Sequence, residues 1–239
     1  ATYEAVMDYS GPLHSDTLTT RVYHLDPRPD LWPGGVYLKK FIYSSWCRCF
    51  LRPAKANIEV RNYRFLRRLG LSVPAVLAAG QRRTFGSVTD AFLITAGIEN
   101  ARPLDSFVQD GRIALLPEEI TEILDQLADV VGTMHRASFF HIDLQWQNVL
   151  IQQNASGQGP RRRVFLIDCP RGGRRWFPLR SWNGRMHDLA GLDKLAGVCF
   201  SPKDRVKWFK QYAGIRKLGW QDRLLIRWIL RELASRRRK

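Results

Sequence analysis

Two segments of the chain decide the fold: His141-Ile-Asp143-Leu-Gln-Trp-Gln-Asn148-Val-Leu-Ile151 and, after a polar turn, Val164-Phe-Leu-Ile-Asp168. Asp143 and Asn148 stand five positions apart and lead into a short apolar strand, and a second apolar strand ends in Asp168. A positioned Asp carboxylate can accept a proton from a hydroxyl, whereas an Asn oxygen and a second carboxylate are hard ligands that suit Mg²⁺. We therefore predict a catalytic base at Asp143 and magnesium ligands at Asn148 and Asp168.

Each of these three residues also has an ordinary explanation when it is taken alone. An Asp or Asn in a loop is usually a turn residue, and an Asp after a buried strand can cap the next element. The order of the segments makes the motif specific: a helix, H-x-D-x-x-x-x-N, an apolar strand, a hairpin and a strand ending in Asp. Protein-kinase-like phosphotransferases use this order to place a base and two metal ligands beside the phosphates of ATP. The pattern therefore indicates a phosphotransferase that uses ATP and Mg²⁺.

A lysine and a glutamate upstream extend this pattern. Val36-Tyr-Leu-Lys39 is similar to the V-A-I-K strand motif, whose ammonium group holds the α- and β-phosphates. Lys40 competes, but neighbouring strand residues point to opposite faces, so only one of the two lysines can reach the nucleotide. We favour Lys39 by its place in the motif, with Glu59 in the following helix as its ion-pair partner. The alternatives are two solvent-facing lysines on an edge strand and a solvated Glu59 beside helix-surface arginines.

A glycine-rich phosphate loop is the weakest part of the match. Ser10-Gly11-Pro-Leu-His-Ser15 lies between two expected strands, but it lacks G-x-G-x-x-G, and an ordinary turn explains it equally well. The phosphates of ATP would then depend more on Lys39 and on Mg²⁺.

The chain changes from strand-rich to helical along its length. The patterns predict strands at Val36–Ile42, Val73–Ala79 and Ala91–Thr95, one helix at Pro53–Leu69, and helices from Leu116 and again from Asp188 onward. We therefore predict an α+β, protein-kinase-like two-lobed fold. Residues 1–98 would form a strand-rich, nucleotide-binding N-lobe, and residues 99–239 a helical C-lobe with the catalytic loop and the acceptor site.

The composition is that of a folded protein with a strong positive charge. The 239 residues include 38 Lys and Arg against 22 Asp and Glu, a formal net charge of +16. This charge favours anionic partners and disfavours polycationic acceptors such as aminoglycosides. Four cysteines are too few for a disulfide scaffold and fit a reducing cytosol, and Cys47 and Cys49 lack a second pair at zinc-site spacing. No apolar run reaches the roughly 20 residues that span a bilayer, and no signal-peptide pattern is found.

Segments across most of the chain resemble the lipopolysaccharide kinase family, which contains heptose and Kdo kinases and InaA-type relatives. The resemblance runs from about Val36 to Tyr212 and rests on V-Y-L-K-K-F at 36–41, E-V-R-N-Y-R-F-L-R-R-L-G-L-S-V-P at 59–74, M-H-R-A at 134–137, H-I-D-L-Q-W-Q-N-V-L at 141–150, F-L-I-D-C-P-R-G at 165–172, H-D-L-A-G-L at 187–192 and S-P-K-D-R-V-K-W-F-K-Q-Y at 201–212. The catalytic motifs are common to all kinase-like folds. The L-G-L-S-V-P segment, the D-L-A-G-L helix start and the late basic helix narrow the resemblance to this family.

The resemblance implies phosphorylation of a heptose or Kdo hydroxyl of the lipopolysaccharide inner core, with ATP and Mg²⁺. Asp143 would be the base, Asn148 and Asp168 the metal ligands, and Lys39 with Glu59 the pair that positions the phosphates. The partner would be an anionic lipopolysaccharide core or a lipid A–core precursor, and nucleic acid is not expected. The location would be cytoplasmic, with peripheral attachment to the inner membrane as a further option.

Other residues take supporting roles under the same resemblance. Asp188, at the expected start of a helix, would brace the catalytic loop, and it could also be a plain helix N-cap. Guanidinium groups suit the phosphates and carboxylates of the core and gather around the expected acceptor segment, at Arg161–Arg163, Arg171, Arg174, Arg175, Arg180 and Arg185. Solvated surface arginines are the alternative for each one alone. The basic tail, Arg236–Lys239, could rest on anionic lipid or be disordered.

Two departures from the protein-kinase pattern and one from the lipopolysaccharide-kinase pattern limit the prediction. Ile142 replaces the Arg of H-R-D, which argues against activation by a phosphorylated loop. Asp168 is followed by Cys169-Pro170 instead of Phe-Gly, and the segment lacks the His-Arg of many lipopolysaccharide kinases, which leaves the identity of the acceptor open.

Two alternative functions remain: a small atypical kinase acting on protein or with the tRNA-modification machinery, and a catalytically silent kinase-like scaffold. The intact Lys, Asp, Asn and Asp set argues against the scaffold.

Overall fold

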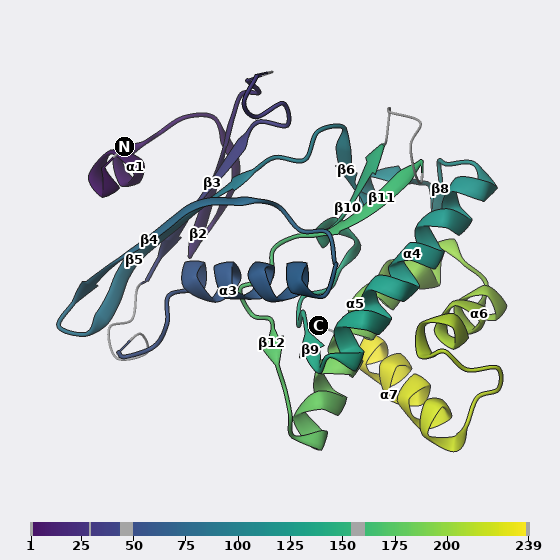
Figure 1. The fold of residues 1–239 in the computed structure, drawn as a ribbon. Coiled ribbons are helices and arrows are strands. Elements are labelled where there is room, and N and C mark those ends of the chain that lie inside the picture. The colour runs from purple at the N-terminus through teal and green to yellow at the C-terminus, as the bar shows by residue number, and fades with distance from the viewer. Residues whose placement is uncertain (1, 29, 44–49, 154–160, 238–239) are drawn as a thin grey trace. The chain divides into compact units, whose positions relative to one another are not determined.

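The computed structural model describes residues 2–28, 30–43, 50–153 and 161–237 (Figure 1). Cys47, Cys49 and the segment 154–160, which the sequence analysis takes as a polar turn, lie outside the described residues. The chain divides into two units, Ala1–Arg68 with Val73–Asn100 and Leu69–Ser72 with Ala101–Lys239. The assignment of nucleotide binding to residues 1–98 and of acceptor binding to 99–239 stays a prediction.

Five strands of the first unit form an antiparallel sheet in the order β1-β2-β3-β5-β4. The strand β3, Val36–Ile42, is central and pairs with β2 on one side and with β5 on the other. Its bounds are those expected from the sequence. The other strands are β1 Leu13–Thr17, β2 Thr20–Leu25, β4 Val76–Thr84 and β5 Ser87–Ala96.

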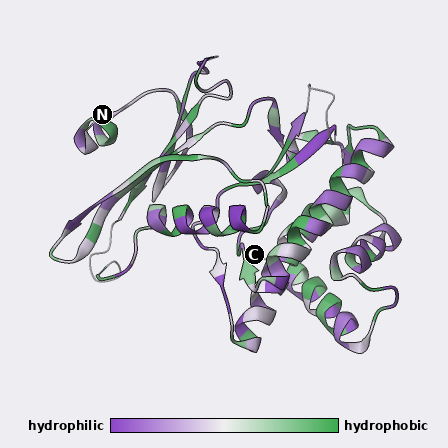
Figure 2. Cartoon of the chain, viewed as in Figure 1, coloured by the Kyte–Doolittle hydropathy of each residue, from purple (hydrophilic) through white to green (hydrophobic). Residues whose placement is uncertain are grey.

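Two helices pack on opposite faces of this sheet. The helix α1, Tyr3–Asp8, rests on a cluster of buried side chains formed by Tyr23, Leu38 and Phe92. The helix α3, Lys55–Arg68, has one buried face, whose residues include Ala56, Glu59, Val60, Tyr63 and Leu66. Figure 2 shows hydrophilic and hydrophobic residues alternating around α3, as expected for a helix with one buried face.

The first twenty residues differ from the expectation. The helix α1 was not predicted, and Ser10–Ser15 does not connect two strands, because α1 precedes it and β1 already begins at Leu13. The hairpin turn between β1 and β2 lies at Leu18 and Thr19 instead. All five residues of β1 are exposed, so this strand shows no alternation of apolar and polar residues that a sequence pattern could reveal.

The second unit is organised around the long helix α4, Pro117–Arg136. Pro117 occupies its first turn, and its buried apolar residues include Ile123, Leu127, Val131 and Met134. A three-stranded antiparallel sheet in the order β11-β10-β6 packs beside α4, where the Gln126 side chain donates to the Arg162 backbone oxygen at 2.7 Å. The strands are β6 Ala101–Pro103, β10 Val149–Gln153 and β11 Arg162–Leu166.

Shorter elements and three further helices complete this unit. The short pieces are the 3-10 turns η1 Leu104–Phe107 and η2 Trp146–Asn148 and the two-residue strands β7 Val108–Gln109, β8 Arg112–Ile113, β9 Phe139–Phe140 and β12 Gly173–Arg174. The helices are α5 Pro178–Cys199, α6 Pro202–Ala213 and α7 Trp220–Arg237. The helices and strands of the two units confirm the predicted α+β class.

Within the described part of the chain, no helix is both long and apolar enough to cross a membrane.

The connector between α3 and β4 belongs to the second unit although the first unit flanks it in the sequence. The Leu166 backbone N–H donates to the Ser72 carbonyl at 3.0 Å, and the Arg163 Nε–H donates to the Ser72 hydroxyl at the same distance. Ser72 therefore extends the hydrogen bonding of β11.

The start of α5 differs from the prediction. Asp188 was expected to open a helix, but α5 begins ten residues earlier at Pro178 and places Asp188 in its interior, fully buried. The N-cap residue of α5 is Phe177, whose phenyl side chain cannot accept a hydrogen bond from the helix. Asp, in contrast, is a preferred N-cap residue. The interpretation of Asp188 as an N-cap is therefore wrong.

Candidate active site

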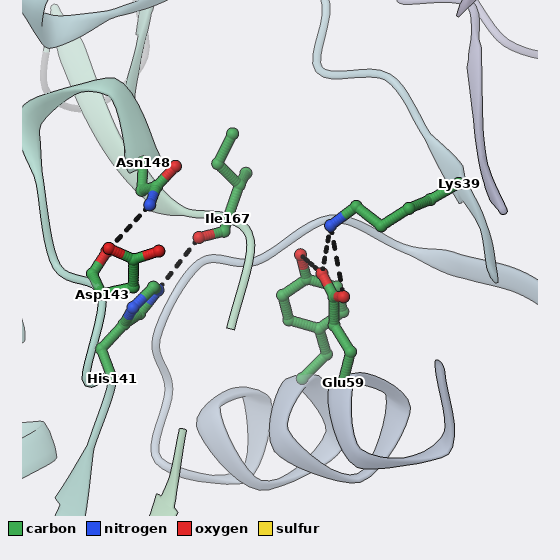
Figure 3. Close-up of polar contacts among 7 residues, drawn as sticks. Lys39, Glu59, His141, Asp143, Asn148 and Ile167 are labelled. Atoms are coloured by element: carbon green, nitrogen blue, oxygen red, sulfur yellow. Dashed lines mark hydrogen bonds and ion pairs between the residues drawn. The ribbon is translucent and has the colours of Figure 1, made fainter. Parts of the chain in front are cut away.

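Lys39 and Glu59 form an ion pair in the first unit. The Lys39 Nζ lies 3.1 Å from Oε1 and 3.2 Å from Oε2 of Glu59, and Figure 3 shows the ammonium pointing at the carboxylate. The Tyr63 hydroxyl donates to Glu59 Oε1 at 2.9 Å. The Glu59 side chain is 1% exposed and that of Lys39 is 16% exposed, so the pair is held at the edge of the buried core. The sequence-predicted partners are therefore in contact; their role with a nucleotide stays a prediction.

Lys40 lies on the opposite face of β3, as strand alternation requires. Its Nζ donates to the Met7 carbonyl at 2.6 Å and also to the Tyr9 carbonyl, and it lies 4.9 Å from the centre of the Tyr23 ring. Burial is the main cause that lowers the pKa of Lys40. Lys40 thus ties the last turn of α1 to the sheet and does not meet Glu59.

We expect the two lysines to give opposite results in phosphoryl transfer when each is replaced by Met. Lys39→Met should lower phosphoryl transfer about 10²–10³-fold, because one preorganised charge near the phosphates is lost. It should also lower the free energy of unfolding, because the buried Glu59 carboxylate loses its cation. Lys40→Met should leave transfer nearly unchanged and lower the free energy of unfolding by about 1–3 kcal/mol, because two buried carbonyls lose their donor. Steady-state kinetics and urea unfolding of both variants provide the measurement. Equal losses of activity would contradict the assignment.

Hydrogen bonds to the Asp188 carboxylate fix the loop that carries Asp143. The Asp188 Oδ2 accepts the backbone N–H of His141 at 2.8 Å, and its Oδ1 accepts that of Ile142 at 2.6 Å. Ile142 has φ +70°, a left-handed conformation that is costly for a β-branched residue. The carboxylate therefore holds a strained backbone immediately before the predicted base, which is the bracing role expected for Asp188.

A buried chain of hydrogen bonds supports Asp188. The His135 Nε2 lies 3.1 Å from Asp188 Oδ2, and its Nδ1 lies 2.8 Å from the Tyr212 hydroxyl. A neutral His135 that carries its proton on Nε2 satisfies both contacts, since Nε2–H donates to the carboxylate and Nδ1 accepts from the phenol. Burial is the main cause that lowers the pKa of His135, in agreement with this neutral form. Burial likewise raises the pKa of Tyr212 to about 12.

These shifts predict the pH dependence of stability. Below about pH 6.5 a histidine in the unfolded chain binds a proton, whereas the buried His135 of the folded protein, with its lowered pKa, stays neutral. The free energy of unfolding should therefore fall as the pH drops. Above about pH 10 an unfolded tyrosine loses the proton that Tyr212 keeps up to about pH 12, so stability should also fall as the pH rises through that window. Urea midpoints measured against pH test both limbs. His135→Gln should flatten the acid limb and Tyr212→Phe the alkaline limb; unchanged limbs would contradict the assignments.

Asp143 is positioned by its neighbours in the loop. The Asn148 Nδ2 donates to the Asp143 backbone carbonyl at 2.8 Å, and the Gln145 Nε2 donates to Asp143 Oδ1 at 2.7 Å. The His141 Nε2 donates to the Ile167 carbonyl at 3.0 Å, which ties this loop to the segment before Asp168 (Figure 3). The two sequence motifs that carry the predicted site residues are therefore in contact.

The two predicted metal ligands offer oxygen atoms of the right kind. Since the amide nitrogen of Asn148 is used by the loop, its oxygen is turned away from Asp143, as Figure 3 shows. Asp168 follows β11 with φ +57°, an unusual conformation for a residue other than Gly. Mg²⁺ is commonly held by one or two protein oxygens together with phosphates and water. The donor set fits that ion, although among the described residues no group of three His, Cys, Asp or Glu could hold a metal alone.

Some supporting residues were not singled out from the sequence. In the structure His135 contacts Asp188 and Gln145 contacts Asp143 directly, whereas Tyr212 reaches Asp188 through His135. A histidine on the apolar face of a helix and a tyrosine at the end of another usually indicate packing, so they gave no functional signal. Their roles depend on contacts across 53 and 77 positions of the chain, which a local pattern does not contain.

The fold and these residues define a protein-kinase-like phosphotransferase. A solved structure described as WaaP in complex with acyl carrier protein matches with a TM-score of 0.74 and 23% identity, covering 97% of this chain and 91% of that one. The sequence model of the lipopolysaccharide kinase (Kdo/WaaP) family matches residues 17–212. The chain therefore belongs to this family, and the predictions of its fold, of a kinase and of the family are confirmed.

Curated relatives agree with this assignment. The lipopolysaccharide core heptose(I) kinase WaaP of Pseudomonas aeruginosa is 24% identical over 181 residues, which cover 74% of this chain and 67% of that protein. The 3-deoxy-D-manno-octulosonic acid kinases of Pasteurella multocida and Haemophilus influenzae are 30% identical over 118 residues and 31% over 142. These alignments span 49% and 59% of this chain and about half of those kinases, 45% and 52%. Membership in a kinase family implies the use of ATP.

Proposed function

We propose that the protein transfers the γ-phosphoryl group of ATP to a sugar hydroxyl, of heptose or Kdo, in the lipopolysaccharide inner core. The observation that carries the proposal is the intact set of Lys39 with Glu59 and of Asp143 with Asn148 and Asp168 in a member of this family. The acceptor would be a lipopolysaccharide core or a lipid A–core precursor. The enzyme would act in the cytoplasm, at or near the inner-membrane surface.

Each residue of this set has a chemical role in the proposal. Asp143 accepts the proton of the acceptor hydroxyl while the oxygen forms its bond to the γ-phosphorus and the bond to ADP breaks. Lys39, oriented by Glu59, binds the α- and β-phosphates. Asn148 and Asp168 would hold Mg²⁺, which when bound neutralises charge on the phosphates. Residues 1–98 would thus bind the nucleotide, and residues 99–239 would supply the base and the acceptor site.

The departures from the protein-kinase pattern are present at the site. Ile142 occupies the position of the Arg that would pair with a phosphorylated loop residue, and it is held by the Asp188 carboxylate. Cys169 is buried, and Pro170 follows it where a Phe-Gly switch would stand. We therefore propose an enzyme whose catalytic loop is fixed without phosphorylation.

A partner is proposed from the solved relative, which is in complex with acyl carrier protein. In this chain an apolar cavity of about 390 Å³ lies among α4, α5, α6 and α7, lined in part by Leu127, Leu192 and Ile229. We propose that an acyl carrier protein binds here with its acyl chain in the cavity. Retention of acylated but not of unacylated carrier protein on the immobilised kinase would support this, and equal or absent retention would contradict it.

Radiolabel transfer from ATP tests the function. We expect label in core oligosaccharide and in purified lipopolysaccharide, none in casein or tRNA, and loss of all transfer when EDTA replaces Mg²⁺. Mass spectrometry of the product would identify the sugar that gains the phosphate. Label in casein or tRNA would favour the atypical-kinase alternative, and no transfer to any acceptor would favour the catalytically silent scaffold.

A further inference from the structure

Three apolar side chains protrude where β12 leads into α5. Trp176, Phe177 and Leu179 are 66%, 69% and 85% exposed, and every residue from Trp176 to Arg180 is exposed. Pro178 begins α5 at this point, so the three side chains are carried on the first turn of a 22-residue helix and the residues just before it. We refer to Trp176, Phe177 and Leu179 as the apolar tip. Adjacent exposed aromatic and aliphatic side chains on a soluble surface usually mark a contact site.

Arginine side chains lie beside the aromatic rings of the apolar tip. The Arg174 guanidinium carbon lies 3.8 Å from the centre of the Trp176 ring, and that of Arg180 lies 5.9 Å from the Phe177 ring. From Cys169 to His187 the sequence contains five arginines, Arg171, Arg174, Arg175, Arg180 and Arg185, and no acidic residue. A partner of this surface must therefore accept apolar side chains and carry negative charge in the same place.

We propose that the apolar tip inserts into the surface of an anionic lipid bilayer. Trp and Phe rings favour the level of the headgroups, Leu favours the acyl region below, and arginines beside them pair with lipid phosphates. The tip protrudes at the end of a helix, which suits insertion into a yielding bilayer better than docking on a flat protein surface. The formal charge of +16 adds long-range attraction to the same kind of surface. The proposal rests on the proposed function only in taking the acceptor to be a glycolipid of that bilayer.

Cosedimentation with vesicles tests the insertion directly. The protein should bind vesicles of phosphatidylglycerol and phosphatidylethanolamine more tightly than vesicles of phosphatidylcholine, and added salt should weaken the binding. The triple variant Trp176→Ser, Phe177→Ser, Leu179→Ser should bind the anionic vesicles about tenfold or more weakly. The matched control Leu18→Ser, Phe85→Ser removes side chains that are 101% and 86% exposed in the other unit, and should bind like the wild type. Thermal unfolding checks that both variants fold.

Two acceptors separate this inference from the proposed function. The triple variant should phosphorylate water-soluble core oligosaccharide at the wild-type rate and vesicle-embedded lipopolysaccharide more slowly. If no acceptor is phosphorylated but vesicle binding still depends on the apolar tip, the proposed function fails and the inference stands. Unchanged vesicle binding by the triple variant would overturn the inference. A loss of acyl carrier protein binding without any loss of vesicle binding would also overturn it, by assigning the tip to a protein partner.

Discussion

Asp143→Asn is expected to lower phosphoryl transfer about 10²–10⁴-fold while the protein folds normally, because the variant cannot accept the hydroxyl proton. The Asn side chain has nearly the same shape and keeps an oxygen that can accept the hydrogen bond from Gln145, now 2.7 Å from Asp143 Oδ1. The free energy of unfolding should therefore change by less than about 1 kcal/mol. The turnover number for transfer to core oligosaccharide and urea unfolding measure the two quantities.

Asp129→Asn is the matched control for Asp143→Asn. Asp129 is exposed on α4 of the same unit, so this variant also removes one negative charge but leaves the loop intact. It should keep wild-type turnover. If Asp143→Asn retained turnover within about threefold of the wild type, Asp143 would not be the general base, since removal of such a base costs far more.

Asp188→Ala should produce a large loss of stability. The substitution leaves the N–H groups of His141 and Ile142 and the Nε2–H of His135 without their acceptor in a region closed to water. We expect the free energy of unfolding to fall by about 3–5 kcal/mol, since buried unpaired donors cost about 1–3 kcal/mol each. Turnover should fall as well, because nothing then holds Ile142 in its left-handed conformation beside Asp143. Urea midpoints and slopes, with single-turnover rates at low temperature, test this.

Two milder variants should lower the free energy of unfolding by less than Asp188→Ala does. Asp188→Asn keeps one acceptor oxygen and should lie between the wild type and the Ala variant in stability. Tyr212→Phe removes only the hydrogen bond to His135 Nδ1 and should cost about 1 kcal/mol. A loss of less than about 1 kcal/mol for Asp188→Ala would mean that water or another group replaces the carboxylate, which contradicts the bracing role.

The parts of the fold that were predictable from the sequence are those with strong local patterns. The strand Val36–Ile42 and the long helix from Pro117 follow directly from apolar periodicity and from turn signals at their ends. The start of α5 was placed ten residues late because Asp188 resembles a capping residue and Phe177 does not. The exposed strand β1 and the six-residue helix α1 lacked a buried face long enough to detect.

The site divides in the same way. The spacing of Asp143 and Asn148 and the place of Lys39 in its strand are local features and could be predicted from the sequence. The hydrogen bonds that fix the Asp143 loop could not be predicted, since Asp188, His135 and Tyr212 come together only when α4, α5 and α6 pack. Physical contact between distant positions carries no signature in a single sequence. The resemblance to a known family pointed to Asp188, and the structure shows which atoms it holds.

The connector at Ser72 has a consequence for dissecting the protein. The chain passes from the first unit to the second at 68–69, returns at 72–73, and passes over again at 100–101. A fragment that begins at Ala101 would therefore lack Ser72, which pairs with Leu166 and Arg163 on β11, and the strand that precedes Asp168 would keep a bare edge. Neither unit is a contiguous piece of sequence. An isolated catalytic fragment would need the Leu69–Ser72 tetrapeptide restored, for example by circular permutation, before it could report on the intact loop.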